Sequence, residues 1–335
     1  MSTENYPLQT PPRLTGLNPE TKRSLTESEL AHELALMCRT AALAVAPYIL
    51  AARTKLDAAT TETKSDFHDP VTPFDRGAET AISALLGYFV PGSYKLGEEH
   101  GEEILPGGAP ADLPEEVLFE DPGFHVDARS LASRVKWIVD PIDGTANFAA
   151  GFIYFGTSIA AQLDGKTVAA AITLPYTDEV FWANDTNGWI ERAGTFYELK
   201  SGNIPGEKTI TEEGEAVLLT YFPTSSEVRK FPALATKGHA DLVHAFRAVR
   251  RPGAAAIDLA QVAAGRAGAL FATRVKPWDV AAGAHLVTVS GGHVDLRDLG
   301  EGELAGMQPA IAATSAGLQS QTLKDLLDKV EAEYR

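Results

Sequence analysis

One segment of this chain constrains its fold more than any other: WIVDPIDGTANF, at residues 137–148. It begins with apolar and β-branched residues, which are typical of a buried strand. Pro141 then fixes φ and interrupts the ladder of hydrogen bonds, and Gly144 permits a positive φ or a close backbone approach. Asp140 and Asp143 stand where the strand ends, and packing alone requires neither acid. We therefore expect a functional site at the end of this strand.

Length and charge limit the kinds of partner this protein can have. A chain of 335 residues exceeds one comfortable hydrophobic core, so two domains that share an interface are expected. The formal net charge of −16 and the pI of about 4.9 argue against nucleic acid or an anionic membrane as a partner. They do not exclude a small anionic substrate, because bound cations can reverse the sign of the local charge.

The apolar segments favour a soluble, cytoplasmic protein. The N-terminal residues are polar and contain prolines, so we expect no signal peptide. The long apolar run at residues 30–52 is interrupted by His32, Glu33 and Arg39, which are costly in a bilayer and favour a buried helix instead. The single cysteine, Cys38, lies in the same run and is expected to be a small buried hydrophobic residue.

Two helices are predicted in the first part of the chain. Residues 1–25 are expected to be a flexible tail, after which Thr26 and Glu29 make a capping box for a long helix. Thr72 is expected to cap a second helix, of which Pro73 is the first residue. The apolar face of that helix consists of Phe74, Ala78, Ile82, Leu85 and Phe89.

Strands are predicted on both sides of the segment at 137–148. Residues 94–96 form a short strand, and a long acidic surface loop with at most one helical turn follows at 101–134. Asp164-Gly165 is a hairpin signal, so the strands around it belong to an antiparallel meander. The expected strands of this meander are 156–163, 167–174, 180–183, 188–192 and 195–199.

A change of pattern after residue 200 predicts a second domain. The segment 201–214 is rich in glycine and charge, and it separates an N-terminal α+β domain (26–204) from a C-terminal α/β domain (205–335). In the second domain we expect strands at 216–222, 270–273 and 294–296, and helices at 227–237, 255–267, 280–290 and 319–334.

Five acids stand at the ends of predicted elements: Asp75, Glu98, Asp140, Asp143 and Asp279. Taken singly, such acids are usually helix caps or solvated surface residues, and this remains the alternative for Asp75, Glu98 and Asp279. The ends of layered elements meet at one edge, however, and several carboxylates can share a cleft only if cations neutralise them. Oxygen ligands without a Cys or His cluster favour Mg²⁺ over Zn²⁺.

Gly144 and Thr145 extend this expected site toward an anion. Backbone N–H groups at a turn that opens into a helix can bind a phosphate. The Thr145 hydroxyl can then orient a water molecule for in-line attack on phosphorus, while two or three Mg²⁺ ions lower the pKa of that water and stabilise the leaving oxygen. This arrangement predicts metal-assisted hydrolysis of a phosphomonoester without a covalent enzyme intermediate.

Four motifs in order resemble the inositol monophosphatase family of Mg²⁺-dependent, lithium-sensitive phosphatases. Residues 140–148 match the first family signature, and 278–283, running on to Gly291-Gly292, match the second. Residues 71–75 and 97–99 match two shorter motifs, and 255–266 resembles the substrate-side helix of bacterial members. The resemblance covers roughly residues 30–334. It implies a layered αβαβα sandwich that is usually a homodimer.

The resemblance also implies roles for individual positions. A first metal would be held by Glu98, Asp140 and the Ile142 carbonyl, a second by Asp140, Asp143 and Asp279, and a third, weaker one by Glu98 and, through water, Asp75. The implied ion is Mg²⁺, with Mn²⁺ as an alternative. Thr145, Glu98 and Asp143 would be catalytic, Gly144 and Thr145 would bind the phosphate, and Asp143, Ala255, Arg274 and His100 are the candidate substrate contacts.

Two departures from the family pattern concern the substrate. His100 stands where Ser is usual, either as a tolerated variation or as a pH-sensitive neighbour of the site. Residues 271–277 lack the acid that contacts inositol hydroxyls in inositol-specific members and carry Arg274 and Lys276 instead. These bases either contact a second anionic group or are solvated surface residues.

Several functions remain open at this point. The favoured one is hydrolysis of inositol monophosphate or a related small sugar or polyol phosphate. Within the family, histidinol phosphate, fructose 1,6-bisphosphate and nucleotide 3′-phosphates are alternative substrates, and a catalytically silent metal- or phosphate-binding member is the non-enzyme alternative. A phosphatase with an aspartyl-phosphate intermediate is disfavoured, because Pro141 occupies the position of the nucleophilic Asp.

Overall fold

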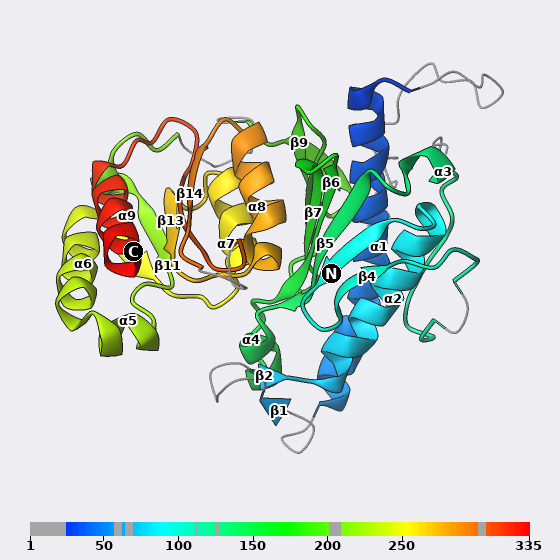
Figure 1. Cartoon of the computed structure of the whole chain (residues 1–335), viewed down its shortest axis with the longest axis horizontal. Helices are drawn as coiled ribbons and strands as arrows, with labels where there is room; N and C mark the ends of the chain where they lie inside the picture. Colours follow the sequence, from blue (N-terminus) through cyan, green and yellow to red (C-terminus); the bar gives the residue numbers. More distant parts are fainter. Residues whose placement is uncertain are drawn as a thin grey trace, which may run out of the picture.

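Two β-sheets and three layers of helices make up the computed structural model of this chain (Figure 1). The residues that it describes are 25–56, 62–63, 70–110, 113–124, 128–200, 209–300 and 306–335. The predicted tail at 1–25 lies almost wholly outside them. From one side of the molecule to the other the layers run helix, sheet, helix, sheet, helix, which confirms the predicted αβαβα sandwich.

The larger sheet has eight strands in the order β10-β9-β8-β7-β6-β5-β3-β4. Only the β3–β5 pair is parallel; β6 to β10 form the predicted antiparallel meander, and β5 pairs with β6 in the same antiparallel sense. The strands are β3 (Tyr94–Gly97), β4 (Gly101–Ile104), β5 (Val135–Asp143), β6 (Gly156–Leu163), β7 (Lys166–Leu174), β8 (Glu179–Ala183), β9 (Gly188–Arg192) and β10 (Thr195–Glu198).

Helices α1 (Glu27–Lys55) and α2 (Pro73–Phe89) cover the outer face of this sheet. Both begin at the predicted N-caps, Thr26 and Thr72, and at Thr72 the structure shows a capping box that was predicted only for Thr26. On length and composition alone α1 could cross a membrane, but 50% of its most apolar window is buried inside the protein. Its buried residues, Cys38 among them, belong to the cluster that joins both helices to the sheet, so α1 is a core helix.

The smaller sheet has the order β12-β11-β13-β15-β14, in which β11 is parallel to both β12 and β13. Its strands are β11 (Val217–Thr220), β12 (Ala248–Arg250), β13 (Ala269–Ala272), β14 (His293–Asp298) and β15 (Pro309–Thr314). The division of the chain into separate domains stays a prediction, but one sheet ends and the other begins on either side of the segment at 199–216.

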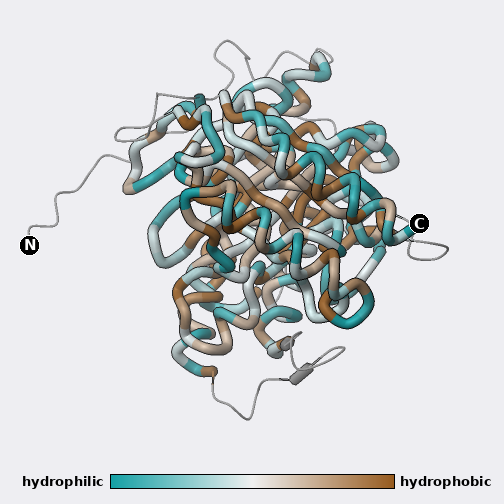
Figure 2. The backbone as a smooth tube through the Cα atoms, turned by 90° about the vertical axis from the view of Figure 1, so that its left-hand side faces the viewer, coloured by the Kyte–Doolittle hydropathy of each residue, from teal (hydrophilic) through white to brown (hydrophobic). Residues whose placement is uncertain are grey.

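Helices α7 (Ala255–Ala263) and α8 (Pro277–Val289) form the middle layer between the two sheets. One hydrophobic cluster includes residues of both sheets and both helices. Helices α5 (Ser225–Lys230), α6 (Pro232–Ala245) and α9 (Gln321–Tyr334) lie beyond the smaller sheet. Seen from that side, the outer helices alternate between hydrophilic and hydrophobic residues, whereas the strands behind them are mainly hydrophobic (Figure 2).

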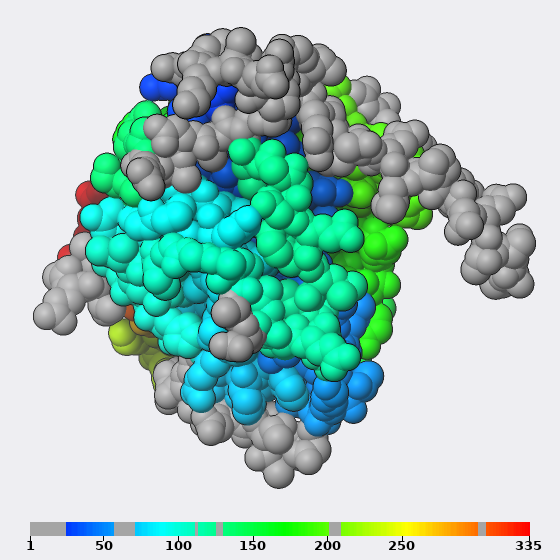
Figure 3. All heavy atoms as spheres, turned by 90° about the vertical axis from the view of Figure 1, so that its right-hand side faces the viewer, coloured from blue at the N-terminus to red at the C-terminus, as the bar shows by residue number. Residues whose placement is uncertain are grey.

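Some sequence predictions were wrong. The segment at 101–134 is not a plain surface loop: its first residues form β4, a charged edge strand whose polarity hid it. Further along, Leu118 N donates to Ala44 O (3.0 Å), and apolar residues of this segment pack on the core beneath. Figure 3 shows that segments between about residues 70 and 124 spread over this face of the molecule. The described residues after β4 are thus packed against the helical layer.

Other errors concern helix breaks and short strands. The helix expected at 227–237 is divided at Phe231, because Pro232 lacks the N–H needed to continue α5 and starts α6 instead. Strands β12 and β15 were not predicted. A short antiparallel pair, β1 (Glu62–Thr63) with β2 (Pro70–Val71), was not predicted either. The remaining short elements are α3 (Ala128–Leu131), which is the single helical turn expected there, and α4 (Thr145–Ala150).

Candidate active site

The end of β5 is irregular at the two acids that the sequence singles out. Asp140 pairs with Ser158 of β6 and Asp143 pairs with Gly156, so three steps on β5 oppose two on β6. Pro141 lies inside this bulge, where it need not donate to the ladder. A bulge turns the side chains that follow it, and such bulges are common beside active sites. Both Asp140 and Asp143 are buried as a result.

Glu98 reaches the same place from the neighbouring strand. It follows β3, which is parallel to β5, and its backbone N donates to Val139 O at 3.1 Å. The tight turn from Glu98 to His100 then reverses the chain into β4. Glu98 therefore lies beside Asp140 because parallel strands end at the same edge of the sheet.

Helices α2 and α8 carry the remaining acids, Asp75 and Asp279, and both helices begin with the same local arrangement. The starts of α2 and α8 read Thr-Pro-Phe-Asp (72–75) and Lys-Pro-Trp-Asp (276–279), with proline at the first helical position. In each, one oxygen of the Asp carboxylate accepts the N–H of the residue before the proline: Asp75 from Thr72 at 2.8 Å and Asp279 from Lys276 at 2.7 Å. The cap role and the site role proposed for these acids are therefore compatible.

The electrostatics of these carboxyl groups are those of a crowded acidic cluster. Burial, and then the charges of Glu98, Asp143 and Asp279, raise the pKa of Asp140 well above its usual value. Burial is also the largest cause that raises the pKa of Asp143, to about 7. The close approach of several like charges therefore makes Asp140 harder to ionise than an isolated carboxyl group.

Asp143 also ties the larger sheet to the middle helical layer. Its Oδ2 accepts the backbone N–H of Ile257, in the first turn of α7, at 3.0 Å. Gly144 follows with φ +87°, and a Cβ there would lie 3.0 Å from Ala254 Cβ and from Tyr154 O. Only glycine fits this approach of β5 to α7 without strain.

The donor set suits a hard cation. Asp140 Oδ1 is buried, and among the described residues it has no hydrogen-bond partner. An unsatisfied anionic oxygen surrounded by other acids is costly unless a cation compensates it. As the side chains stand, no three His, Cys, Asp or Glu groups in the described part of the chain are arranged to hold a metal ion. The chemistry of the donors fits Mg²⁺, and binding would require these side chains to close around it.

Comparison with known proteins settles the family. The model of the inositol monophosphatase family matches residues 30–333. The chain belongs to this family. It is therefore a phosphoric monoester hydrolase of a metal-dependent family, as the four motifs predicted.

Individual relatives agree with this assignment. Inositol-1-monophosphatase SuhB of Mycobacterium tuberculosis is 32% identical over 263 residues, which are 78% of this chain and 80% of the relative. Its solved structure matches with a TM-score of 0.64 at 26% identity and covers 91% of this chain and 98% of that one. Fructose-1,6-bisphosphatase/inositol-1-monophosphatase of Aquifex aeolicus is 26% identical over 266 residues, 79% of this chain and 83% of the relative. Nus factor SuhB of Vibrio cholerae is 32% identical over 199 residues, 58% of this chain and 68% of the relative.

Thr145 contacts two of the groups that the sequence assigned to the site. Its hydroxyl is 3.0 Å from Asp75 Oδ1 and 3.0 Å from the Ile142 carbonyl, and it can donate to either. A hydroxyl proton shared between these acceptors leaves the oxygen able to accept from water. The metal ligands, catalytic residues and phosphate-binding residues assigned to the site all remain predictions.

Two predicted substrate contacts have other partners. Arg274 has φ +54°, and its guanidinium donates to Ser226 Oγ at 2.8 Å and to Gln308 Oε1 at 3.3 Å. Its partners therefore lie in α5 and just before the start of β15. His100 is half-exposed, and its Nδ1 lies 3.3 Å from Glu79 Oε1. Neither contact brings a base onto the acidic cluster, so both substrate roles stay predictions.

Sequence reasoning assigned no role to a second buried acid beside the site. Asp258 on α7 is fully buried and accepts hydroxyl protons from Tyr154 at 2.7 Å and Tyr221 at 2.9 Å. These contacts join the segment after α4, the segment after β11 and the middle helical layer. Asp258 is three residues after Ala255, and that spacing, which puts both on one face of α7, was the available signal.

Replacing Asp258 by Asn should remove a pH-dependent destabilisation of the metal-free protein. Burial raises the pKa of Asp258 from 3.8 to about 7, so between these values the unfolded chain ionises first and stability falls as the pH rises. We expect the stability advantage of Asp258→Asn over the wild type to be smaller at pH 5 than at pH 8, where it should reach at most about 4 kcal/mol.

Urea unfolding at both pH values would measure this difference. Asp241→Asn, an exposed change on α6, is the control and should be neutral at both. A stability difference for Asp258→Asn that is the same at pH 5 and pH 8 would contradict the assignment of this pKa.

Proposed function

We propose that this protein is a Mg²⁺-dependent phosphomonoesterase that hydrolyses inositol monophosphate or a related small sugar or polyol phosphate. The observation that carries the proposal is the buried, unpartnered Asp140 Oδ1 in a cluster with Glu98, Asp143 and Asp279. Such a cluster needs counter-charge, and a phosphomonoester brings only more negative charge. Divalent cations would neutralise the negative charge of both the cluster and the phosphate.

The ligand assignments come from the family resemblance and suit this cluster. Glu98, Asp140 and the Ile142 carbonyl would hold one ion, Asp140, Asp143 and Asp279 a second, and Glu98 with Asp75 a third, weaker one. When bound, Mg²⁺ would lower the pKa of the attacking water and neutralise the charge that develops on the leaving oxygen.

The remaining steps belong to the chain's own residues. Thr145, fixed by Asp75 and the Ile142 carbonyl, would accept a hydrogen bond from the attacking water and so orient it toward phosphorus. Glu98, which lies beside Asp140, would take the proton that this water releases. The backbone N–H groups of Gly144 and Thr145 would hold the phosphate oxygens. Because water is the nucleophile, inorganic phosphate and the free alcohol are the products.

The substrate class is the least constrained part of the proposal. The names of the Mycobacterium and Aquifex relatives support inositol monophosphate and fructose 1,6-bisphosphate, and histidinol phosphate and nucleotide 3′-phosphates remain alternatives. The Vibrio relative is named a Nus factor, yet the net charge of −16 disfavours direct binding of this chain to nucleic acid. A cytoplasmic homodimer is proposed on the family resemblance alone.

Phosphate release from a panel of phosphomonoesters tests the activity. The panel comprises inositol, sugar, histidinol and nucleotide 3′-phosphates, each assayed with Mg²⁺, with Mn²⁺ and after chelation. We expect release that depends on the divalent ion, because four acids otherwise repel the substrate. No release from any member of the panel in the presence of Mg²⁺ would refute catalysis and favour a silent phosphate- or metal-binding protein.

A further inference from the structure

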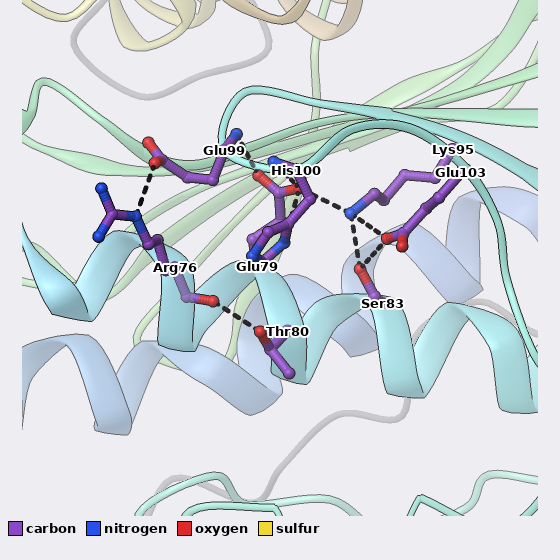
Figure 4. A network of polar contacts seen from close by, with 8 residues as sticks. All are labelled: Arg76, Glu79, Thr80, Ser83, Lys95, Glu99, His100 and Glu103. Carbon is purple, nitrogen blue, oxygen red and sulfur yellow. Dashed lines mark hydrogen bonds and ion pairs between the residues drawn. The ribbon is translucent and has the colours of Figure 1, made fainter. Parts of the chain in front are cut away.

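A fully buried ion pair lies beneath the turn that carries Glu98. Lys95 of β3 and Glu79 of α2 are both almost completely shielded from solvent, and Lys95 Nζ is 2.6 Å from Glu79 Oε1 (Figure 4). The ammonium group also contacts Ser83 Oγ at 2.8 Å and Glu103 Oε1 at 2.5 Å. Its three N–H donors therefore have three acceptors.

The Glu79 carboxylate also accepts hydrogen bonds from two backbone N–H groups of the turn that follows β3. Its Oε2 accepts the N–H of Glu99 at 2.7 Å, and its Oε1 accepts the N–H of His100 at 3.1 Å. These two residues directly follow Glu98 in the turn between β3 and β4. A Cβ on Gly97, the residue before Glu98, would lie 2.1 Å from Glu79 Oε1, so the carboxylate fills the space beneath the turn.

Glu98 is thereby fixed from two directions. Its own N–H donates to Val139 O on β5, and the next two N–H groups donate to Glu79. Glu79 is one helical turn after Asp75, so α2 places one acid in the site and supports a second from below. Because hydrogen bonds hold the backbone of residues 98–100 on both sides, the Cα atom from which the Glu98 side chain extends has a fixed position.

We propose that Glu79 is a positioning residue that sets the place of Glu98 for metal binding. This inference rests on the proposed function, and it adds a residue to which neither the four motifs nor the comparisons assign a role. Stability alone is a weak reason for such a pair, because a buried ion pair is often no more stabilising than apolar residues of the same size. Apolar residues cannot supply an anionic acceptor for two adjacent N–H groups beneath a metal ligand.

Glu79→Gln is the test, because the amide keeps the size of the side chain and offers only one acceptor oxygen. We expect Mg²⁺ affinity to fall by about 10- to 100-fold, as is typical when the partner that orients a metal ligand is changed. Calorimetric titration of the metal-free protein measures this directly. The Mg²⁺ concentration for half-maximal phosphate release should rise by the same factor, with KM at saturating Mg²⁺ unchanged.

Two further variants separate positioning from folding. Glu79→Gln combined with Lys95→Met removes both charges, so it should regain thermal stability lost in the single variant while its Mg²⁺ affinity stays low. If the single variant does not fold, the Mg²⁺ affinity of this double variant is compared with that of the wild type instead. Glu179→Gln breaks another ion pair, of the buried Glu179 with the half-buried Arg266 at 2.7 Å, and should keep wild-type Mg²⁺ affinity.

The possible outcomes are distinct. A wild-type protein that takes up no Mg²⁺ would overturn the proposed function itself. Wild-type Mg²⁺ affinity in Glu79→Gln and in the double variant would overturn the positioning role while leaving that function intact. An equal loss of affinity in Glu179→Gln would also overturn it, because the effect would then follow from any broken ion pair.

Discussion

Asp143→Asn should abolish phosphate release while leaving the fold intact. At saturating Mg²⁺ we expect kcat to fall by at least about 100-fold, which is the upper end of the loss seen when only a partner of a metal ligand is removed. The amide oxygen can still accept from Ile257 N–H, so the contact with α7 remains. One negative charge leaves a crowded cluster, and the stabilisation by Mg²⁺ should be lost with it.

The same variant should be at least as thermally stable as the metal-free wild type. Burial and neighbouring acids raise the pKa of Asp143 to about 7, which means that its charge costs stability at neutral pH. Circular dichroism melting with and without Mg²⁺ would show both effects. Asp164→Asn, on the exposed β6–β7 turn, is the matched control with normal activity. Near-normal turnover in Asp143→Asn would refute the assignment of the site.

Gly156→Ala should be among the most destabilising single changes in the chain. A Cβ at this position would lie 1.7 Å from the backbone oxygen of Thr173 on β7, and a backbone atom cannot move aside as a flexible side chain can. The strands would have to separate where β6 also faces the bulge at Asp143. We expect a loss of at least about 4 kcal/mol in the free energy of unfolding, with activity lost in parallel.

Denaturant unfolding would measure this loss. Gly214→Ala is the matched control, because a Cβ there meets open space and the backbone is not in the left-handed region. Its stability should remain within about 0.5 kcal/mol of the wild type. A Gly156→Ala protein that unfolds at the wild-type denaturant concentration would show that β6 and β7 can separate at this point without cost.

The sequence predicted those parts of the fold that have local causes. The Thr72 cap, the Asp164-Gly165 hairpin and the strand before Asp140 each follow from residues adjacent in the chain, and all three were confirmed. Strand β15 was missed because Pro309–Thr314 is rich in alanine, which has little preference for strands. Its place depends on pairing with β13 and β14, which no local pattern reports.

The candidate site divides in the same way. Its acids could be named because they stand at element ends and match family motifs, although their assigned roles stay predictions. The roles of Glu79 and Lys95 could not be predicted, because a charged residue in a sequence is normally taken as solvent-exposed. Their burial follows from α2 packing across β3, a tertiary contact. Asp75 was given two alternative roles, and the structure shows that its two oxygens permit both.

The matching starts of α2 and α8 bear on how this chain can vary. In each, proline fixes the first helical φ and the Asp returns a hydrogen bond to the residue before it, so four consecutive residues determine where the carboxylate points. The hydrogen bond that orients each carboxylate lies within these four residues and uses no group upstream of Thr72 or Lys276. Insertions there should therefore be tolerated by the acidic cluster, and new substrate contacts could be acquired through them without disturbing Asp75 or Asp279.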